Sequence, residues 1–496
     1  MKRLHRAALV IGSGAVASAA WRRFDASHAR RTATLTRLSA KSGAQYATLQ
    51  ARSKFVSPER QEVLKQEFEI RTAQQVTEVL GNMKGAVMKL GQMASYIDQG
   101  LPEHVREMLA QLQTQAPPMA YELVEQVVSA ELGGSPLEVF AQFDPTPIAA
   151  ASIGQVHRAV TKDGREVAVK IQYPGVDAAI KADLQNSDLL FGALGTLLSG
   201  LDPKPIVEEL RARLIEELDY VREAENQQFF ADYYRGHPNI SVPEVLPELC
   251  TSRVLVTEFV RGATWSEALH WPDEERNLLA ETLYRYAFGG IYRLGAFNGD
   301  PHPGNYLCAP GGKITFLDYG LCKFFTEDEI QQFSDMIRAM VLDHDMAEVR
   351  KVWTRAGVIG NTDTFTDEEL RDYFIHFFEQ VMEPGRRLIT SDYASKSLRK
   401  YFDLNGPHKE MIRSITLPAS LVIIQRINLG LWALIGELNA TADWRAMAEE
   451  LWPSTNADPS TPMGQAIRTW EETTAKRTPD GHPVPIRRPG TAANGH

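Results

Sequence analysis

Three polar residues in the second half of this 496-residue chain have the spacing of a metal-assisted phosphate site. Asp300 and Asn305 are separated by four residues, and Asp318 follows an apolar stretch, residues 314–317. Mg²⁺ prefers hard oxygen ligands and shares its coordination sphere with phosphate, so one carboxylate and one amide oxygen suffice from the protein. Either aspartate alone would be an ordinary turn residue. Together they predict that Asn305 and Asp318 hold Mg²⁺ while Asp300 positions the reacting group.

An alanine-rich segment followed by a lysine forms a second candidate group. Residues 149–156 have the spacing of the glycine-rich loop that covers ATP phosphates in protein kinases, with alanine at the first two glycine positions. Lys170 follows in the sequence Val-Ala-Val-Lys, where kinases place the lysine that contacts the α and β phosphates; a solvent-facing lysine is the alternative. Alanine resists the positive φ angles that glycine accepts, so we expect a different fit to nucleotide. The predicted nucleotide contacts are Ala149, Ala150, Ala151, Ser152, Gly154, Val156, Lys170, Glu258 and Val260.

Two glutamates are candidates to pair with this lysine. We expect a helix over residues 205–226, in which Glu217 shares an apolar face with Val221. Breaking a buried ion pair costs roughly 3–5 kcal/mol, so an inward carboxylate on that face should have a lysine partner. Glu223 lies on another face, where a solvated acidic surface is the alternative. The sequence leaves open which glutamate pairs with Lys170.

The chain divides into helical and strand-rich segments, which predicts an α+β fold. Residues 57–145 have the apolar spacing of helices, residues 146–260 contain alternating strands with a β-hairpin, and residues 261–450 are mostly helical. Residues 1–56 form an N-terminal segment that we expect to be mobile or membrane-associating. Pro, Thr, Gly and Arg dominate residues 451–496, which predicts a disordered tail.

Composition restricts the classes of partner. Lys and Arg total 53 and Asp and Glu total 63, so the net charge of −10 gives no support to a nucleic-acid partner. Cys250, Cys308 and Cys322 show no CxxC spacing and are too few for a disulfide framework, so we expect them to be packing residues in a reducing environment. The most hydrophobic segment, residues 417–438, carries charged side chains such as Glu437. It is therefore expected to be a core helix rather than a membrane span.

The N-terminal residues carry two weak signals. Residues 1–6 are basic and residues 7–21 are apolar, as in a secretion signal, but the apolar stretch is short for a membrane span. Residues 12–17 match a dinucleotide-binding fingerprint, yet no acidic residue follows about 20 positions later to bind a ribose. We therefore expect neither export nor dinucleotide binding.

In this order the segments resemble the UbiB family of atypical protein-kinase-like ATPases, which is associated with isoprenoid-quinone biosynthesis and lipid homeostasis. The resemblance covers about residues 55–440. It implies a two-lobed protein-kinase-like fold with a helical N-terminal extension, and ATP and Mg²⁺ as cofactors. The motifs that carry it are Lys89-Leu90-Gly91-Gln92, Ala149 to His157, Val167-Ala168-Val169-Lys170, Glu217 to Asn226, Asp300 to Asn305 and Asp318-Tyr319-Gly320.

The resemblance also implies roles that spacing alone does not give. Lys89 would lie over the active site and pair with Glu217, while Lys170 would pair with Glu223. The covering helix would exclude a polypeptide, which favours a small-molecule or lipid-like substrate such as a prenyl or quinone precursor. Quinone-biosynthesis enzymes are candidate partners, and the expected location is cytoplasmic with a peripheral membrane contact. The candidate catalytic residues are Asp300, Lys170, Glu217, Glu223 and Lys89.

Departures from ordinary kinases keep other functions open. Asn298-Gly299 stands where His-Arg precedes the catalytic aspartate, Tyr319 replaces a phenylalanine, and no APE triplet follows. Asp300 with His302 also resembles the catalytic loop of aminoglycoside and choline phosphotransferases, so a small-molecule phosphotransferase is one alternative. A pseudokinase scaffold that binds nucleotide and lipid without turnover is the other.

Overall fold

The computed structural model describes residues 119–151, 153–177, 215, 218–298, 302–359, 364–393, 408, 410–411 and 419–474. Contacts group the chain into two units, Met1–Met119 with Tyr173–Leu218 and Ala120–Gln172 with Asp219–His496, and almost all described residues belong to the second. The predictions made for residues 1–118 lie outside the described part, as do those for residues 475–496. Four candidate site residues also lie outside it: Lys89, Ser152, Glu217 and Asp300.

The second unit begins with two helices and a five-stranded antiparallel sheet. The described helices at its start are α5 (Tyr121–Leu132) and α6 (Pro136–Val139). The strands are β1 (Gln142–Phe143), β2 (Ala149–Ala151), β3 (Gly154–Val160), β4 (Glu166–Gln172) and β6 (Val254–Glu258). β3 pairs with β1, β2 and β4, and β4 pairs with β6, which confirms the predicted hairpin. Because β1 joins the sheet, the strand-rich region begins before the predicted boundary at residue 146.

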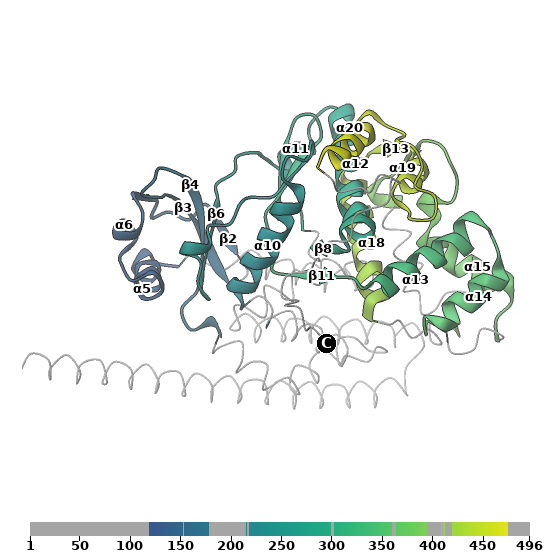
Figure 1. The fold of residues 1–496 in the computed structure, drawn as a ribbon, viewed down its shortest axis with the longest axis horizontal. Helices are drawn as coiled ribbons and strands as arrows, with labels where there is room; N and C mark the ends of the chain where they lie inside the picture. Colours follow the sequence, from purple (N-terminus) through teal and green to yellow (C-terminus); the bar gives the residue numbers. More distant parts are fainter. Residues whose placement is uncertain are drawn as a thin grey trace, which may run out of the picture. The chain divides into compact units, whose positions relative to one another are not determined.

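Helix α10 (Tyr220–Tyr234) packs against β6 (Figure 1). Asp219 is its N-cap, and the side chain accepts a backbone hydrogen bond from the first turn. The prediction of one helix over residues 205–226 is therefore wrong in its described part, because α10 starts afresh after Asp219 and continues to Tyr234. This new start changes which side chains face inward. Val221 is 44% exposed, whereas Glu223 is buried.

Helices dominate the remainder of the second unit. They are α11 (Trp265–Ala268), α12 (Asp273–Gly289), α13 (Glu327–Ile337), α14 (Met346–Arg355), α15 (Asp367–Phe374), α18 (Ala419–Leu438), α19 (Trp444–Leu451) and α20 (Pro462–Thr473). Two π-helical segments, η2 (Gly290–Leu294) and η4 (Arg338–Leu342), continue α12 and α13. The short 3₁₀ segments are η1 (Pro247–Leu249), η3 (Pro303–Asn305), η6 (Ile375–Phe377) and η7 (Glu379–Val381).

Three small sheets connect these helices. One has the strand order β5 (Ile240–Ser241), β10 (Lys313–Phe316), β9 (Tyr306–Ala309) and β7 (Ala263–Thr264). The other two are β8 (Ala296–Asn298) with β11 (Cys322–Phe324), and β12 (Arg387–Leu388) with β13 (Thr441–Ala442). The β9–β10 hairpin carries the predicted metal residues at one of its ends.

Several local predictions in the helical region are confirmed. Thr326 and Thr366 are N-caps with complete capping boxes, as their spacing to a following glutamate predicted. α18 packs beside α12 (Figure 1), and its Leu431, Ile435 and Leu438 side chains are buried, so the hydrophobic segment is a core helix. No helix in the described segments combines the length and apolar character needed to cross a bilayer.

The three cysteines are free thiols, as their spacing predicted. Cys308 lies on β9 inside the core, and burial raises the pKa of its thiol to about 12. Cys250 and Cys322 are partly buried. A buried, protonated thiol is a poor nucleophile and metal ligand, so Cys308 acts as a packing residue.

The predicted disordered tail is wrong for its described part. α20 (Pro462–Thr473) lies inside residues 451–496, and Trp470 is 7% exposed. The Trp470 indole donates a 3.2 Å hydrogen bond to the backbone oxygen of Arg235, just after α10. A helix this short needs only a few apolar anchors, and the surrounding Pro and Thr residues hide their spacing in the sequence.

Candidate nucleotide-binding site

Lys170 lies at the middle of the five-stranded sheet, opposite Val156 of β3 and Leu255 of β6. Its ammonium donates a 2.6 Å hydrogen bond to Oε1 of Glu223 on α10. Oδ2 of Asp318, which follows β10, lies 3.7 Å from the same Nζ. The structure thus brings a strand, a helix and a loop together around one cation, and it pairs Lys170 with Glu223.

Burial and charge together set the protonation state of this group. The Glu223 side chain is 3% exposed and the Lys170 side chain is 19% exposed. Burial alone would lower the pKa of Lys170, but the carboxylates of Glu223 and Asp318 hold it well above its usual value. The Tyr220 ring, centred 5.0 Å from Nζ, adds a cation–π contact. Lys170 therefore remains a cation at physiological pH.

The Asp318 carboxylate is held by the loop that carries it. The backbone N–H of Gly320 donates a 3.0 Å hydrogen bond to Oδ1, which leaves Oδ2 on the side of Lys170. The Asn298 amide on β8 donates to the backbone oxygen of Asp318 at 3.2 Å. A Cβ at position 320 would lie 3.4 Å from Oδ1 and 3.7 Å from Glu223, which are van der Waals contacts and place this backbone directly against both carboxylates. The loop geometry therefore fixes one carboxylate oxygen and leaves the other available.

Asn305 lies beside Asp318 at one end of the β9–β10 hairpin. The backbone N–H of Leu317 donates a 3.0 Å hydrogen bond to the backbone oxygen of Asn305, which extends the pairing of β9 with β10 by one residue pair. The Asp318 side chain is 31% exposed and Asn305 is partly exposed. One accessible carboxylate and one amide at the same end of the hairpin are the kinds of oxygen donor that Mg²⁺ prefers. Asp300, the third member of the predicted set, lies outside the described residues.

The alanine-rich segment forms a strand rather than an open loop. β2 pairs with β3 so that Ala149 faces Val156 and Ala151 faces Gly154. A Cβ on Gly154 would lie 2.2 Å from the Ile171 backbone oxygen. Glycine is therefore required by close packing against β4, a reason that the motif alone did not supply. Ala149 and Ala150 are exposed on the sheet edge, where they remain predicted nucleotide contacts.

Glu258 is the last residue of β6 and Val260 follows two residues later, so both lie farther from the lysine. Glu258 pairs with Val167, three residues before Lys170 on β4, which corresponds to about 10 Å at the usual strand rise. The Glu258 backbone N–H already donates to the Glu244 oxygen at 2.8 Å. These two positions suit the base end of a nucleotide better than its phosphates.

Three supporting residues lie in or beside the sequence motifs, but sequence reasoning assigned no structural role to them. Asn298 was only a departure from the kinase pattern, yet it holds the Asp318 backbone. Asn226 on α10 donates a 3.1 Å hydrogen bond to the Tyr319 oxygen and ties the helix of Glu223 to the same loop. The Tyr319 side chain is fully buried, with its ring centre 4.8 Å from that of Phe230. An asparagine close in the sequence to a candidate site residue is the signal that could have identified the first two.

Comparison with known proteins supports the class that this geometry defines. Residues 111–353 match the family model described as ABC1 atypical kinase-like domain. The chain is 32% identical over 306 residues to AarF domain-containing protein kinase 1 of Gallus gallus, covering 60% of this chain and 59% of the relative. It is 33% identical over 264 residues to the mitochondrial atypical kinase COQ8 of Saccharomyces cerevisiae, covering 53% of each protein.

A solved structure extends the match. The structure of Rv3197 from Mycobacterium tuberculosis in complex with erythromycin is 32% identical, with a TM-score of 0.58, covering 80% of this chain and all of that one. The fold is therefore kinase-like and of the α+β class, as predicted. The chain belongs to the ABC1 atypical kinase-like family, whose relatives carry the names AarF domain kinase and COQ8, and the UbiB resemblance is confirmed. The chain spans between about half and three fifths of the length of these curated relatives.

Proposed function

We propose that this chain is an Mg²⁺-dependent, ATP-binding kinase or ATPase that acts on a small or lipid-like substrate. The observation that carries the proposal is the contact of Lys170 with Glu223 beside Asp318. Kinases hold the phosphates of ATP with a strand lysine that is fixed by a helix glutamate, next to a metal-binding aspartate. The same three residue types occur here on the same kinds of element.

Each residue contributes one part of the proposed chemistry. Lys170 is a stable cation that can hold the α and β phosphates, and Glu223 fixes its position. Asp318 and Asn305 offer a carboxylate and an amide oxygen to Mg²⁺, whose charge offsets that of the phosphates when it is bound. Asp300 is the proposed residue that positions the acceptor hydroxyl or water.

The physiological context is proposed from the family. Relatives from yeast and rat are named as mitochondrial atypical kinases, and the UbiB resemblance is to a family associated with quinone biosynthesis. We therefore propose a role in isoprenoid-quinone or lipid metabolism, with a prenyl or quinone precursor as substrate and quinone-biosynthesis enzymes as partners. The proposed location is cytoplasmic with peripheral contact to a membrane.

Calorimetric titration of the full chain with ATP and Mg²⁺ tests the proposal. Lys170→Met keeps the length of the side chain but removes the charge, and loss of a charged hydrogen bond should weaken ATP binding about tenfold to a hundredfold. Lys351→Met, on an exposed face of α14, is the matched control and should bind as the wild type does. Equal affinity in all three proteins would contradict the proposal. Release of phosphate by the wild type, with loss in Asp300→Asn, separates an enzyme from a scaffold.

A small-molecule phosphotransferase is a second candidate, favoured by the erythromycin complex of the Mycobacterium tuberculosis relative. A screen that measures ATP consumption with erythromycin, an aminoglycoside and choline tests this activity directly. Transfer of phosphate to one of them, lost in Lys170→Met, would favour the phosphotransferase. ATP turnover that none of the three compounds changes would favour the lipid-linked function.

A further inference from the structure

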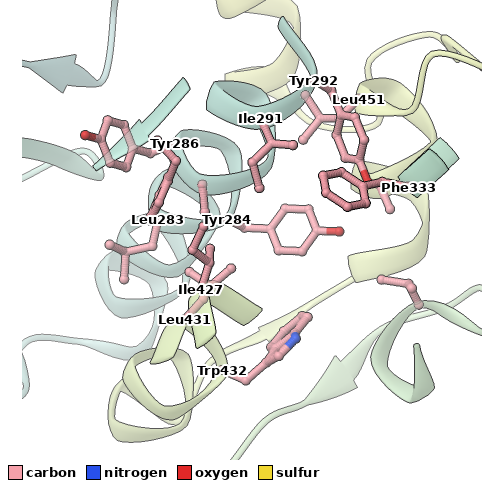
Figure 2. Close-up of a cluster of buried hydrophobic side chains, with 14 of the residues drawn as sticks. Leu283, Tyr284, Tyr286, Ile291, Tyr292, Phe333, Ile427, Leu431, Trp432 and Leu451 are labelled. Atoms are coloured by element: carbon pink, nitrogen blue, oxygen red, sulfur yellow. The ribbon is translucent and has the colours of Figure 1, made fainter. Parts of the chain in front are cut away.

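A cavity in the helical region is the second place where this chain can hold a small molecule. It lies among α12, η2, α13 and α18, and its volume is about 100 Å³. Aromatic rings form much of the wall, including those of Tyr284, Tyr292, Phe333 and Trp432, and Figure 2 shows these four gathered together. None of the described side chains that line it is charged. The walls therefore favour a neutral ligand with a flat ring.

Irregular backbone surrounds this cavity. Ile291 and Tyr292 line it from the π-helical segment η2, and Met336 and Ile337 line it just before the π-helical segment η4. A π-helical turn places more residues in each turn than an α-helix does, and such turns are frequent at functional sites. One such turn in the wall and a second directly after the wall residues of α13 indicate a cavity that the fold maintains.

Two hydroxyl groups in the cavity have no hydrogen-bond partner in the described part of the chain. Tyr284 is 2% exposed and Tyr292 is 7% exposed, yet neither hydroxyl bonds to a described residue. Figure 2 shows the Tyr284 oxygen directed into the space between Phe333 and Trp432. Burial raises the pKa of both phenols, so each keeps its proton and can donate it in a hydrogen bond.

Two other polar groups on the same wall are paired. The Trp432 indole donates a 2.7 Å hydrogen bond to the Asn428 side-chain oxygen, and the Asn428 amide donates to the Phe377 backbone oxygen at 3.3 Å. Buried polar groups are normally satisfied in this way. The buried Trp353 indole N–H, which also lines the cavity, has no partner in the described part of the chain. A water or a ligand in the cavity can therefore accept hydrogen bonds from donors on its wall.

We propose that this cavity binds a neutral, ring-containing molecule through an oxygen that accepts a hydrogen bond from the Tyr284 hydroxyl. The Tyr292 hydroxyl, about two helical turns farther along the chain, offers a second donor. The aromatic walls would stack on the ring, and the absence of charge among the described lining residues would exclude an ionic ligand. This site contains none of the residues proposed to hold ATP.

Two probes of nearly equal shape test the proposal. Anisole carries one ring and an ether oxygen, and ethylbenzene has nearly the same shape without the oxygen. Equilibrium dialysis of the full chain should show that both bind and that anisole binds more tightly. Hydrogen–deuterium exchange with bound anisole, mapped by mass spectrometry, should show slower exchange in peptides from α12, η2 and α18. Failure of either probe to bind, or protection only elsewhere, overturns the proposal.

Tyr284→Phe isolates the hydrogen bond because it removes a hydroxyl that has no described partner and keeps the ring. Anisole affinity should fall by up to about tenfold, while ethylbenzene affinity should stay within about twofold. Tyr373→Phe, a buried tyrosine that does not line the cavity, is the matched control and should change neither. An unchanged ratio of the two affinities in Tyr284→Phe contradicts the proposal.

A second variant blocks the space itself. Val381→Met adds volume to the cavity wall and should weaken binding of both probes. Because ATP binds elsewhere, its affinity should be the same in Tyr284→Phe as in the wild type. Equal probe binding in Val381→Met and the wild type counts against the cavity as the binding site.

Discussion

Two buried cations in this chain each face two carboxylates, but only one of them is fully enclosed. The Arg285 side chain on α12 is 4% exposed, and it donates to Glu281 at 2.8 Å, to Glu450 at 2.7 Å and to the Thr461 hydroxyl at 3.0 Å. Lys170 is 19% exposed and makes one hydrogen bond, with its second carboxylate at 3.7 Å.

This difference in exposure distinguishes an ion cluster that stabilises the fold from one that is proposed to bind ligands. Arg285 connects α12, α19 and the N-cap of α20, because its guanidinium donates hydrogen bonds to a residue of each. Lys170 also joins three elements, but the Asp318 carboxylate that faces it is 31% exposed and lies beyond hydrogen-bond distance. Only the second arrangement leaves a carboxylate exposed to solvent, as the proposed phosphate and metal site requires.

Removing the enclosed cation should give the largest loss of stability. Arg285→Met would leave Glu281 and Glu450 buried without a counterion, which costs about 3–5 kcal/mol of the free energy of unfolding. Denaturant unfolding followed by circular dichroism measures this. Arg468→Met removes an exposed pair with Asp458 and should cost less than about 1 kcal/mol. Similar losses for both variants would show that the enclosed cluster is not a structural centre.

Crowding the same cluster should cost less. A Cβ on Gly464 would lie 2.6 Å from both Nη2 of Arg285 and Oε2 of Glu450, so Gly464→Ala should destabilise the fold by about 1–3 kcal/mol. A Cβ on Gly289 would find its nearest neighbour at 3.9 Å, so Gly289→Ala should be neutral or slightly stabilising. The same unfolding measurement compares the two, and equal stabilities would contradict the tight packing.

Substitution in the group of Lys170, Glu223 and Asp318 should change ATP affinity more than the free energy of unfolding. Glu223→Gln leaves Lys170 with a neutral hydrogen-bond acceptor and with Asp318 nearby, so we expect a loss of only about 1 kcal/mol in unfolding free energy. Its ATP affinity should fall by about tenfold or more, because the lysine is no longer fixed. Calorimetry and denaturation on the same preparation measure both changes. A large loss of stability with unchanged affinity would make this cluster structural as well.

A buried neutral group gives the smallest expected effect. Burial lowers the pKa of His157, although the Asp144 backbone oxygen, 2.8 Å from Nδ1, partly opposes this. Below about pH 6.5 the unfolded chain therefore binds a proton that the folded chain does not. As the pH is lowered further, the free energy of unfolding falls by at most about 1.4 kcal/mol per pH unit.

Unfolding measured between pH 7.5 and 5 tests this expectation. His157→Gln should reduce the slope of stability against pH, whereas His270→Gln, at an exposed position, should not. An identical slope in His157→Gln and the wild type would contradict it.

The comparison also shows what the sequence could predict. Lys170 and Asp318 were found because fixed spacing and strand alternation place them, and the β3–β4 hairpin follows from the same alternation. The choice of Glu223 depended on where α10 begins, which the Asp219 cap decides and helical periodicity does not reveal. The helix starts at Thr326 and Thr366 were predictable because capping is local.

The enclosed cluster had no signal in the sequence. Arg285 and Glu450 lie 165 residues apart, and a pair so distant is joined only by the tertiary fold. The cavity was missed for the same reason, because its walls come from several helices and two π-helical segments. α20 was not predicted because the contacts that hold it, from Thr461 to α12 and from Trp470 to the end of α10, exist only in the folded chain.

The dependence of ATP affinity on Mg²⁺ tests the central claim most directly. ATP binding is measured by calorimetry with and without Mg²⁺ for the wild type, for Asp318→Asn and for Asp328→Asn, an exposed control on α13. We predict that Mg²⁺ tightens ATP binding in the wild type and the control but not in Asp318→Asn. A full Mg²⁺ effect in Asp318→Asn would contradict the assignment of this loop as the metal and phosphate site.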